Sequence, residues 1–256
     1  LPMIRFDHVT KRFGAKTVLD DVSYEIERGE TFVIVGRSGA GKSVSLRHMI
    51  RLLTPEAGRV WVGEDCVSEA GGKDLERILG RFGVLFQSAA LLQWLNVEDN
   101  VCLPLRQKTN LSEEEIRARA AEKLALVGLD GAGDKMPDNI SGGMRKRVGL
   151  ARAIVTQPEI VLYDEPTSGL DPVISRQIDL LIDDLRRQLG VTSVVVTHDL
   201  YSALAIGTRV AMLHEGRFAV CAPPEEFVAS EHPVVRDFLQ AQGIADLRDV
   251  RKAFGK

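Results

Sequence analysis

Apolar residues fall into short continuous runs that are separated by longer segments with helical spacing. The run Thr31–Val35 is almost entirely apolar and rich in β-branched residues, which is typical of a strand buried on both faces of a sheet. Segments 44–53 and 173–189 repeat apolar residues at helical intervals. Strands that alternate with helices predict an α/β fold with a mostly parallel sheet and a site at the carboxyl ends of its strands. Further buried strands are predicted at residues 84–86, 160–163 and 191–197.

A second pattern, the alternation of apolar and polar positions, predicts half-buried strands. In the segment 18–26, Val22, Tyr24 and Ile26 alternate with polar residues. The pair Glu215-Gly216 separates two short apolar runs and predicts the turn of a hairpin. Including this one, strands outside the continuous apolar runs are expected at residues 4–13, 18–26, 58–63, 210–213 and 217–221.

Residues 88 to about 155 have a mostly helical pattern, which predicts a helical insertion in the α/β domain. Ser112 and Glu115 form the S-x-x-E pattern of a capping box, and Leu111 and Ile116 have the spacing of a hydrophobic staple. Gly128 is a suitable end for the helix that follows. This helix is either an ordinary packed amphipathic helix or a surface for a partner.

The C-terminal part of the chain begins at Pro223-Pro224. Helices are predicted at 225–229 and around 233–241. The tail from Leu247 onward is rich in charged residues, so we expect its end to fray.

Composition limits the classes of protein that the chain can represent. It has 256 residues, of which 45% are hydrophobic and 27% charged, which suits a soluble globular domain. The net charge of −3 argues against a general nucleic-acid binder. No apolar run approaches 18 residues and no signal peptide is visible, so we expect a cytoplasmic protein without a membrane span. The scattered Cys66, Cys102 and Cys221 fit a reducing compartment and make a zinc site improbable.

The stretch between the strand 31–35 and the following helix matches the phosphate-binding pattern G-x-x-x-x-G-K-[ST]. Glycines let several backbone N–H groups converge on phosphate oxygens, and the helix N-terminus adds partial positive charge. Lys42 is placed to reach the β- and γ-phosphates, and Ser43 to bind Mg²⁺. The pattern therefore predicts a nucleoside triphosphate site with Mg²⁺. Its residues are Gly36, Arg37, Ser38, Gly39, Ala40, Gly41, Lys42 and Ser43.

Two carboxylates follow the buried run 160–163. Asp164 has the position of a Walker B residue, which predicts that it holds Mg²⁺ together with Ser43. Glu165 is then placed to orient and deprotonate an attacking water. By itself, the sequence Asp164-Glu165-Pro166 would also suit a turn that merely ends a strand.

Ser141-Gly142-Gly143 precedes a helical run, so it offers a hydroxyl, exposed N–H groups and a positive helix end, which together predict a second anion site. Alone this pattern is weak. Between a helical insertion and the Walker B strand, it resembles the signature motif of ABC ATPases. Four other residues match that family's motifs in order: Phe13 the adenine-stacking aromatic residue, Gln87 the Q-loop glutamine, Asp171 the D-loop aspartate and His198 the switch histidine.

This resemblance covers residues 4 to about 240 and implies a P-loop ATPase of ABC type that binds ATP and Mg²⁺. It implies a single domain with three regions: a core formed by 1–87 and 156–222 that includes an antiparallel β subdomain, a helical signature subdomain at 88–155, and a C-terminal helical extension at 223–256. Glu165, His198 and Lys42 would be catalytic, and Gln87 would join Ser43 and Asp164 at the metal.

The family also implies that two copies pair head to tail, each ATP lying between the phosphate loop of one copy and Ser141-Gly142-Gly143 of the other. His198 would contact the γ-phosphate, and Asp171 would organise the seam between the copies. Two residues depart from the family pattern. Met144 replaces the usual glutamine of the signature, so one side-chain amide is lost, and Phe13 replaces the common tyrosine, so a ring remains for stacking.

Two stretches resemble, more narrowly, the Mla/Mce-type ATPases that energise lipid transport across the bacterial envelope. They are 86–92 and 141–148. This resemblance implies a homodimer on the inner face of the cytoplasmic membrane, two permease subunits and an MCE-domain lipid-binding protein. For the tail 223–256, a small regulator or the partner subunit is an open candidate contact. Lys146 and Arg147 would equally suit a solvated helix face.

The apolar residues after Gln87 lie where this family receives a helix of its permease. They would suit a groove for that helix or the ordinary core of the helical subdomain, and Trp61 is expected in the core. The residues of the candidate groove are Leu91, Leu92, Trp94, Leu95 and Val97.

Three other classes of P-loop protein have sequence features that differ from those of this chain. Translation factors of the ABC-F kind carry two ATPase domains in one chain, whereas this chain has one. In DNA-maintenance ATPases a long coiled coil separates the two anion motifs, but no sustained heptads lie between Lys42 and Ser141. P-loop kinases lack the signature and the D-loop. A subunit that powers a membrane transporter is the leading hypothesis, with lipid as the favoured substrate and another transporter class as the alternative.

Overall fold

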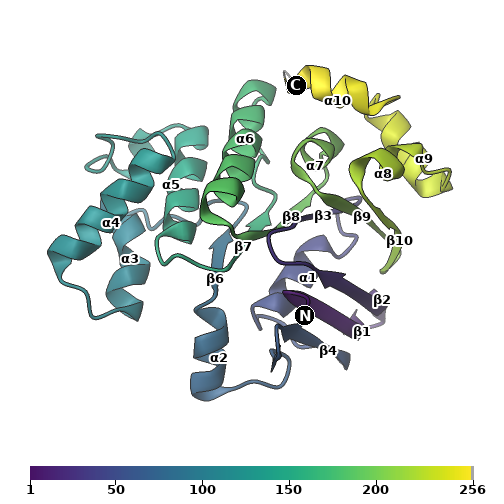
Figure 1. Cartoon of the computed structure of the whole chain (residues 1–256), viewed down its shortest axis with the longest axis horizontal. Coiled ribbons are helices and arrows are strands. Elements are labelled where there is room, and N and C mark those ends of the chain that lie inside the picture. Colours follow the sequence, from purple (N-terminus) through teal and green to yellow (C-terminus); the bar gives the residue numbers. More distant parts are fainter. Residues whose placement is uncertain (255–256) are drawn as a thin grey trace.

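A computed structural model describes residues 1–254 of the chain and contains two β-sheets that lie against each other (Figure 1). The larger sheet has the strand order β10-β9-β3-β8-β7-β6. Every pair in it is parallel except the hairpin β9–β10 at one edge. Its strands are β3 (Thr31–Val35), β6 (Phe82–Leu85), β7 (Ile160–Asp164), β8 (Thr192–Thr197), β9 (Arg209–His214) and β10 (Arg217–Ala222).

The central strands are buried on both faces because successive side chains point to opposite sides of a sheet. In β3, Val33 and Val35 join the core under the helices, whereas Phe32 and Ile34 join the core under the second sheet. This arrangement explains why these strands are continuous apolar runs rather than alternating patterns.

The smaller sheet is antiparallel, with the order β2-β1-β4-β5. Its strands are β1 (Ile4–Phe13), β2 (Lys16–Ile26), β4 (Ala57–Val62) and β5 (Asp65–Cys66). Helix α1 (Lys42–Met49) contributes Leu46 and Met49 to the core between the two sheets. The expectation that Trp61 lies in the core is wrong. Trp61 is half-buried on β4, and the Arg5 guanidinium lies 5.1 Å from its ring centroid.

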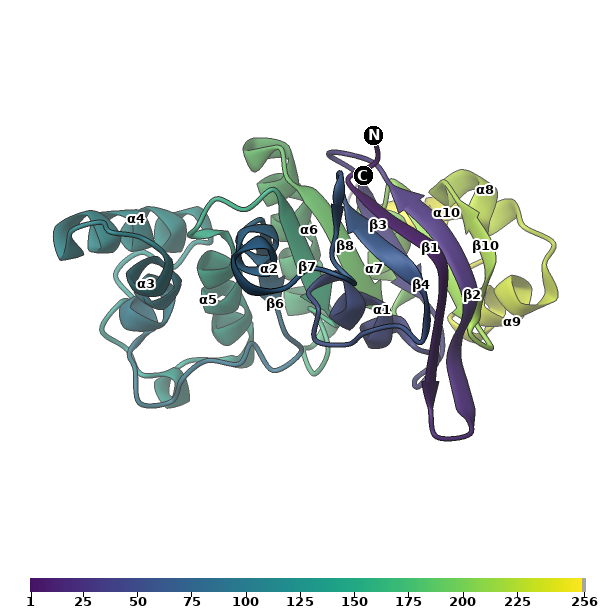
Figure 2. The same cartoon turned by 90° about the horizontal axis from the view of Figure 1, so that it is seen from below.

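Helix α2 (Gly72–Leu79) leads into β6, after which the chain enters the helical insertion. The insertion forms one end of the elongated molecule, and the views in Figures 1 and 2 agree on this. The predicted capping box is confirmed: the Ser112 hydroxyl accepts from the Glu115 N–H, and the Glu115 carboxylate accepts from the Ser112 N–H. The insertion contains α3 (Val97–Lys108), α4 (Glu113–Leu126), a 3₁₀ turn η1 (Pro137–Asn139) and α5 (Gly142–Ile154).

The remaining helices cover the face of the larger sheet that lies away from the smaller sheet, and they form the end of the molecule opposite the helical insertion (Figure 2). The expectation of a fraying tail from Leu247 is wrong for the described residues, because Leu247–Ala253 forms α10, whose Val250 is buried in the core. Of the predicted extension 223–256, residues 255 and 256 lie outside the described part. The helices are α6 (Pro172–Leu189), α7 (Leu200–Ile206), α8 (Pro224–Ala229), α9 (Pro233–Ala241) and α10. None of the helices within residues 1–254 is long and apolar enough to cross a membrane.

Candidate active site

The register of the parallel strands brings the predicted site residues to one edge of the larger sheet. Val35 pairs with Thr197, Asp164 with Val196, and Leu85 with Tyr163. Strands β3, β6, β7 and β8 therefore end at the same edge, and the loops that follow them converge there.

The phosphate loop between β3 and α1 has a backbone that only glycine fits at two positions. Gly36 has φ 156°, and a Cβ there would lie 2.5 Å from the Leu213 carbonyl oxygen. Gly41 has φ 105°, and a Cβ there would lie 2.9 Å from the Val18 carbonyl oxygen. Gly41 caps α1 without any side-chain hydrogen bond, so the first N–H groups of α1 stay available to an anion.

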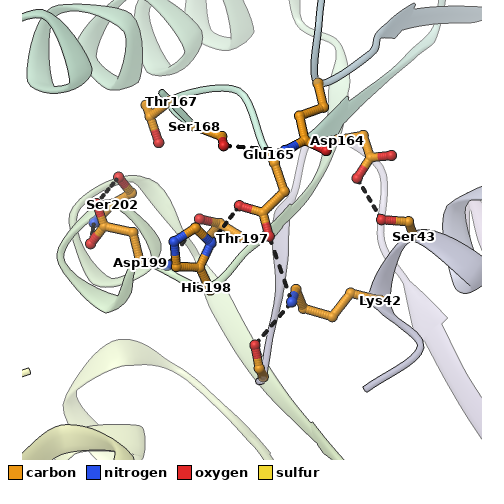
Figure 3. Close-up of polar contacts among 12 residues, drawn as sticks. Lys42, Ser43, Asp164, Glu165, Thr167, Ser168, Thr197, His198, Asp199 and Ser202 are labelled. Carbon is orange, nitrogen blue, oxygen red and sulfur yellow. Dashed lines mark hydrogen bonds and ion pairs between the residues drawn. The ribbon is translucent and has the colours of Figure 1, made fainter. Parts of the chain in front are cut away.

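Lys42, Glu165 and His198 form a connected group at the centre of the site (Figure 3). The Lys42 Nζ atom lies 3.5 Å from one oxygen of Glu165, and His198 Nδ1 lies 2.8 Å from the other. Lys42 also donates to the carbonyl oxygens of Gly36 at 2.9 Å and Arg37 at 3.3 Å. The Glu165 carboxylate, only 13% exposed, is thus held by two different elements.

The oxygen atoms that could hold a magnesium ion lie beside this group. The Ser43 hydroxyl donates to Asp164 Oδ1 at 2.7 Å, so both side chains already point to one place. The side-chain amide of Gln87 donates through Nε2 to the Ser168 hydroxyl at 3.2 Å, which leaves the side-chain oxygen, Oε1, available as a ligand. A hydroxyl, a carboxylate and an amide oxygen are the hard donors that Mg²⁺ prefers, so the residues fit this ion.

Glu165 has an unusual backbone conformation, with φ 48°. Its N–H donates to the Val196 carbonyl at 2.9 Å, and its carbonyl accepts from the Ser168 N–H and, at 3.2 Å, from Lys146 Nζ. Lys146 also donates to the Gln87 carbonyl.

These bonds correct one reading of the sequence: Lys146 does not lie on a solvated face, because its side chain is 5% exposed and points inward. Burial lowers the pKa of this amine to about 8, while Glu165 and Asp164 oppose that shift.

A cavity of about 810 Å³ opens beside the phosphate loop. Phe13 lies on its wall, half exposed, with Lys11 Nζ 5.4 Å from the ring centroid. Two residues of the C-terminal extension, Phe238 and Gln242, also line the cavity, and sequence reasoning missed them because no local motif marks them. The cavity brings together the predicted residues Phe13, Arg37, Ser38, Gly39, Gly41, Lys42, Ser43, Gln87, Glu165 and His198.

The signature residues lie elsewhere, at the start of α5, and they do not line this cavity. The Ser141 hydroxyl caps α5 by accepting from the Met144 N–H at 3.2 Å. Gly143 packs closely on α6, since a Cβ there would lie 2.7 Å from Ile174 Cγ2. Asp171 also lies outside the cavity and caps α6 by accepting from the N–H groups of Val173 and Ile174.

Comparisons with known proteins agree with this geometry. Residues 19–168 match the family described as ABC transporter. The probable ribonucleotide transport ATP-binding protein mkl of Mycobacterium bovis is 43% identical over 244 residues, covering 95% of this chain and 68% of the relative. The methionine import ATP-binding protein MetN of Cereibacter sphaeroides is 40% identical over 242 residues, covering 92% and 68%.

A solved structure gives the same result. The dimeric, post-hydrolysis state of the ATP-binding cassette MJ0796 bound to ADP and Pi superposes with a TM-score of 0.79 at 33% identity, covering 87% of this chain and 99% of that one. The fold is therefore that of an ABC cassette, with an antiparallel subdomain and a helical insertion. The chain belongs to the ABC transporter family, as an ATP-binding and ATP-hydrolysing subunit of a transport system.

Proposed function

We propose that the chain hydrolyses Mg–ATP with the residues gathered at the edge of the larger sheet. The observation that carries this assignment is the Glu165 carboxylate held between Lys42 and His198. Glu165 is the general base for the attacking water, and His198 and Lys42 contact the γ-phosphate. Phe13 stacks on the adenine. Mg²⁺, held by Ser43, Asp164 and Gln87, neutralises phosphate charge when bound.

We also propose that a second copy of the chain completes each site. The cavity contains the phosphate loop and Glu165 but not Ser141, although the N-terminus of α5 suits an anion. A head-to-tail pair would bring Ser141-Gly142-Gly143 of one copy to the phosphate bound by the other. Asp171, close to both α6 and the loop after Glu165, would lie at that seam. The related cassette of known structure is dimeric, which supports this arrangement.

The exposed Trp94 is our proposed contact with the membrane permease. Its side chain is 74% exposed, whereas its neighbours Leu91 and Val97 are buried in the helical subdomain. The sequence allowed either a groove or a core for this stretch. Leu92 and Leu95 are half-buried, so Trp94 is the residue of the stretch that is mainly open to a partner. A large exposed ring beside an apolar subdomain suits a helix of a membrane partner. This contact would hold the chain at the inner face of the cytoplasmic membrane.

Lipid remains our proposed class of cargo, supported by the resemblance of 86–92 and 141–148 to Mla/Mce-type ATPases. An MCE-domain protein and a small regulator would then be further partners. The relatives named above are described as ribonucleotide and methionine transporters, and these cargoes are the alternatives to be tested.

Reconstitution with the permease subunits tests the proposed class of cargo. With the permease in liposomes, ATP should drive movement of a labelled phospholipid, but not of a labelled ribonucleotide or methionine. The reverse preference would contradict the lipid assignment.

Trp94→Glu tests the contact itself. The variant should lose co-purification with the permease, because a charge replaces the apolar ring, while the isolated chain keeps its ATPase rate. Leu52→Glu is the matched control, since Leu52 is 60% exposed but lies in the segment that follows α1, outside the helical insertion. Equal loss in both variants, or in neither, would contradict the docking role of Trp94.

A further inference from the structure

The C-terminal extension reaches the active site through the end of helix α9. Phe238 and Gln242 line the same cavity as Lys42, Glu165 and His198. Helix α9 is anchored by Val235 and Leu239, both buried in the core under the larger sheet. Gln242, at the C-terminal cap of α9, is therefore presented from a fixed support.

The side-chain amide of Gln242 makes two hydrogen bonds, and both go to the backbone of the segment after β8. Its Nε2 donates to the His198 carbonyl at 2.8 Å, and its Oε1 accepts from the Leu200 N–H at 2.9 Å. Only one orientation of the amide satisfies both groups.

One of these bonds, the one to the Leu200 N–H, completes the start of helix α7. The first N–H groups of a helix have no partner within it. Asp199 caps α7 and accepts from the N–H groups of Tyr201 and Ser202. The N–H of Leu200, the first residue of α7, is instead satisfied by Gln242. The backbone that carries His198 is thus fixed on one side by β8 and on the other by the C-terminal extension.

The position of the His198 ring depends on this backbone, because the ring itself is 61% exposed and is not enclosed by packing. Its Nδ1 lies 2.8 Å from the Glu165 carboxylate. A small shift of the backbone would move the ring away from Glu165, and misplacement by about 1 Å costs up to about a hundredfold in rate.

We propose that Gln242 is a positioning residue for His198, so that the C-terminal extension is a functional part of the ATPase site of its own subunit. The inference rests on the role proposed above for His198. It assigns to α9 a task beyond packing: docking of the extension sets the geometry of the histidine and through it the rate of hydrolysis.

Gln242→Met tests the proposal, because it removes the amide but retains the length of the side chain. For Mg–ATP hydrolysis by the full chain, we expect kcat to fall about tenfold while KM changes by less than about twofold, since the phosphate loop is untouched. Gln240→Met is the matched control: Gln240 is exposed on the same helix and should tolerate the change. Wild-type kcat in Gln242→Met would overturn the proposal.

Gln242→Glu separates the two bonds and guards against a folding defect. A carboxylate can still accept from the Leu200 N–H but cannot donate to the His198 carbonyl. This variant should unfold at nearly the wild-type temperature and still show the lowered kcat. A normal kcat in this stably folded variant would show that the bond to His198 has no catalytic consequence.

A double-mutant cycle shows whether Gln242 acts through His198. In a His198→Ala background, single-turnover release of phosphate should not slow further when Gln242→Met is added, because the positioned group is already gone. Effects that multiply would overturn the inference while leaving the role of His198 intact. Wild-type turnover in His198→Ala alone would instead overturn the role proposed for His198, and the inference with it.

Discussion

Glu165 shows how much of the site depends on contacts that arrive from distant parts of the chain. Its φ of 48° is unfavourable for a residue with a side chain and costs about 1–3 kcal/mol. Bonds from β8, from α5 through Lys146 and from the loop at Ser168 hold the backbone in place. Lys42 and His198 hold the carboxylate. The strain is thus offset by neighbours that also fix the direction of the carboxylate.

Asp179 is a second residue whose surroundings determine its chemistry. Burial raises the pKa of its carboxyl to about 7; the Ser202 hydrogen bond opposes this shift, and the nearby Asp199 adds to it. The Ser202 hydroxyl lies 2.6 Å from an Asp179 oxygen and 3.1 Å from an Asp199 oxygen. One hydroxyl proton cannot serve both carboxylates, so a proton on Asp179 allows both hydrogen bonds to form.

This shift predicts a specific dependence of stability on pH. Because the pKa of Asp179 is higher in the folded than in the unfolded chain, its stabilising contribution is complete below about pH 4 and is lost as the pH rises through about 7. Asp179→Asn is neutral at every pH. In denaturant unfolding, the free energy of unfolding of the variant relative to that of the wild type should therefore be higher at pH 8 than at pH 5, by about 1–3 kcal/mol. An equal difference at both pH values would contradict the raised pKa.

At the scale of elements, the seam between β6 and α5 joins the helical insertion to the larger sheet. Gly83, in the middle of β6, allows α5 to approach the strand closely. A Cβ at this position would lie 2.0 Å from the Ala153 carbonyl oxygen and 3.1 Å from Pro158 Cγ. Neither the backbone of α5 nor the proline ring can yield easily, so the seam requires glycine.

Gly83→Ala should therefore lower the free energy of unfolding by about 3 kcal/mol, as overpacking against rigid backbone does. Gly71→Ala is the matched control, because Gly71 has an extended backbone, with φ −150°, and a Cβ added there would meet no atom within 4 Å. It should change stability by less than about 1 kcal/mol. The two variants can be compared by urea unfolding. Similar losses in the free energy of unfolding in both would show that close contact with α5 does not require glycine at position 83.

The sequence predicted the elements best where a local pattern is enough to define them. Thr31–Val35 is a buried strand because each of its side chains enters one of two cores, and that requirement is visible in the residues themselves. The capping box at Ser112 is likewise a local code. The charged tail was misjudged because the burial of Val250 depends on α7 and α8, which lie far away in the sequence.

The same distinction holds for the candidate site. The phosphate loop and the strand ends were found because consecutive residues carry their chemistry. Lys146 and Gln242 were not recognised as part of the site, because their partners are the backbone atoms of residues some 19 to 59 and 42 to 44 positions away. A backbone carbonyl has no sequence signature, so such bonds appear only in the folded chain.

At the scale of the whole molecule, the functional groups are divided between separate parts. The helical insertion with Ser141 lies at one end, the C-terminal helices lie at the other, and the phosphate loop lies between them (Figures 1 and 2). Lys146 ties α5 to Glu165 and Gln87 within one subunit. When one copy closes on another, a shift of α5 at the partner's ATP would therefore also reach Glu165 and Gln87 in its own subunit.

Each ATP site, as proposed above, combines residues of two copies of the chain. Two inactive variants test this proposal when they are mixed. Glu165→Gln lacks the general base but can still bind ATP. Ser141→Asp preserves the cap of α5, since aspartate is a good capping residue, but places negative charge against the phosphate. Either variant alone should release almost no phosphate.

In a mixed dimer, the Ser141→Asp copy contributes an intact Glu165 and the Glu165→Gln copy contributes an intact Ser141, so one of the two sites is complete. Phosphate release by an equal mixture should therefore recover to about a quarter of the wild-type rate, because about half of the dimers are mixed. A mixture that releases no more phosphate than the two variants measured separately would show that each subunit hydrolyses ATP without the signature residues of its partner.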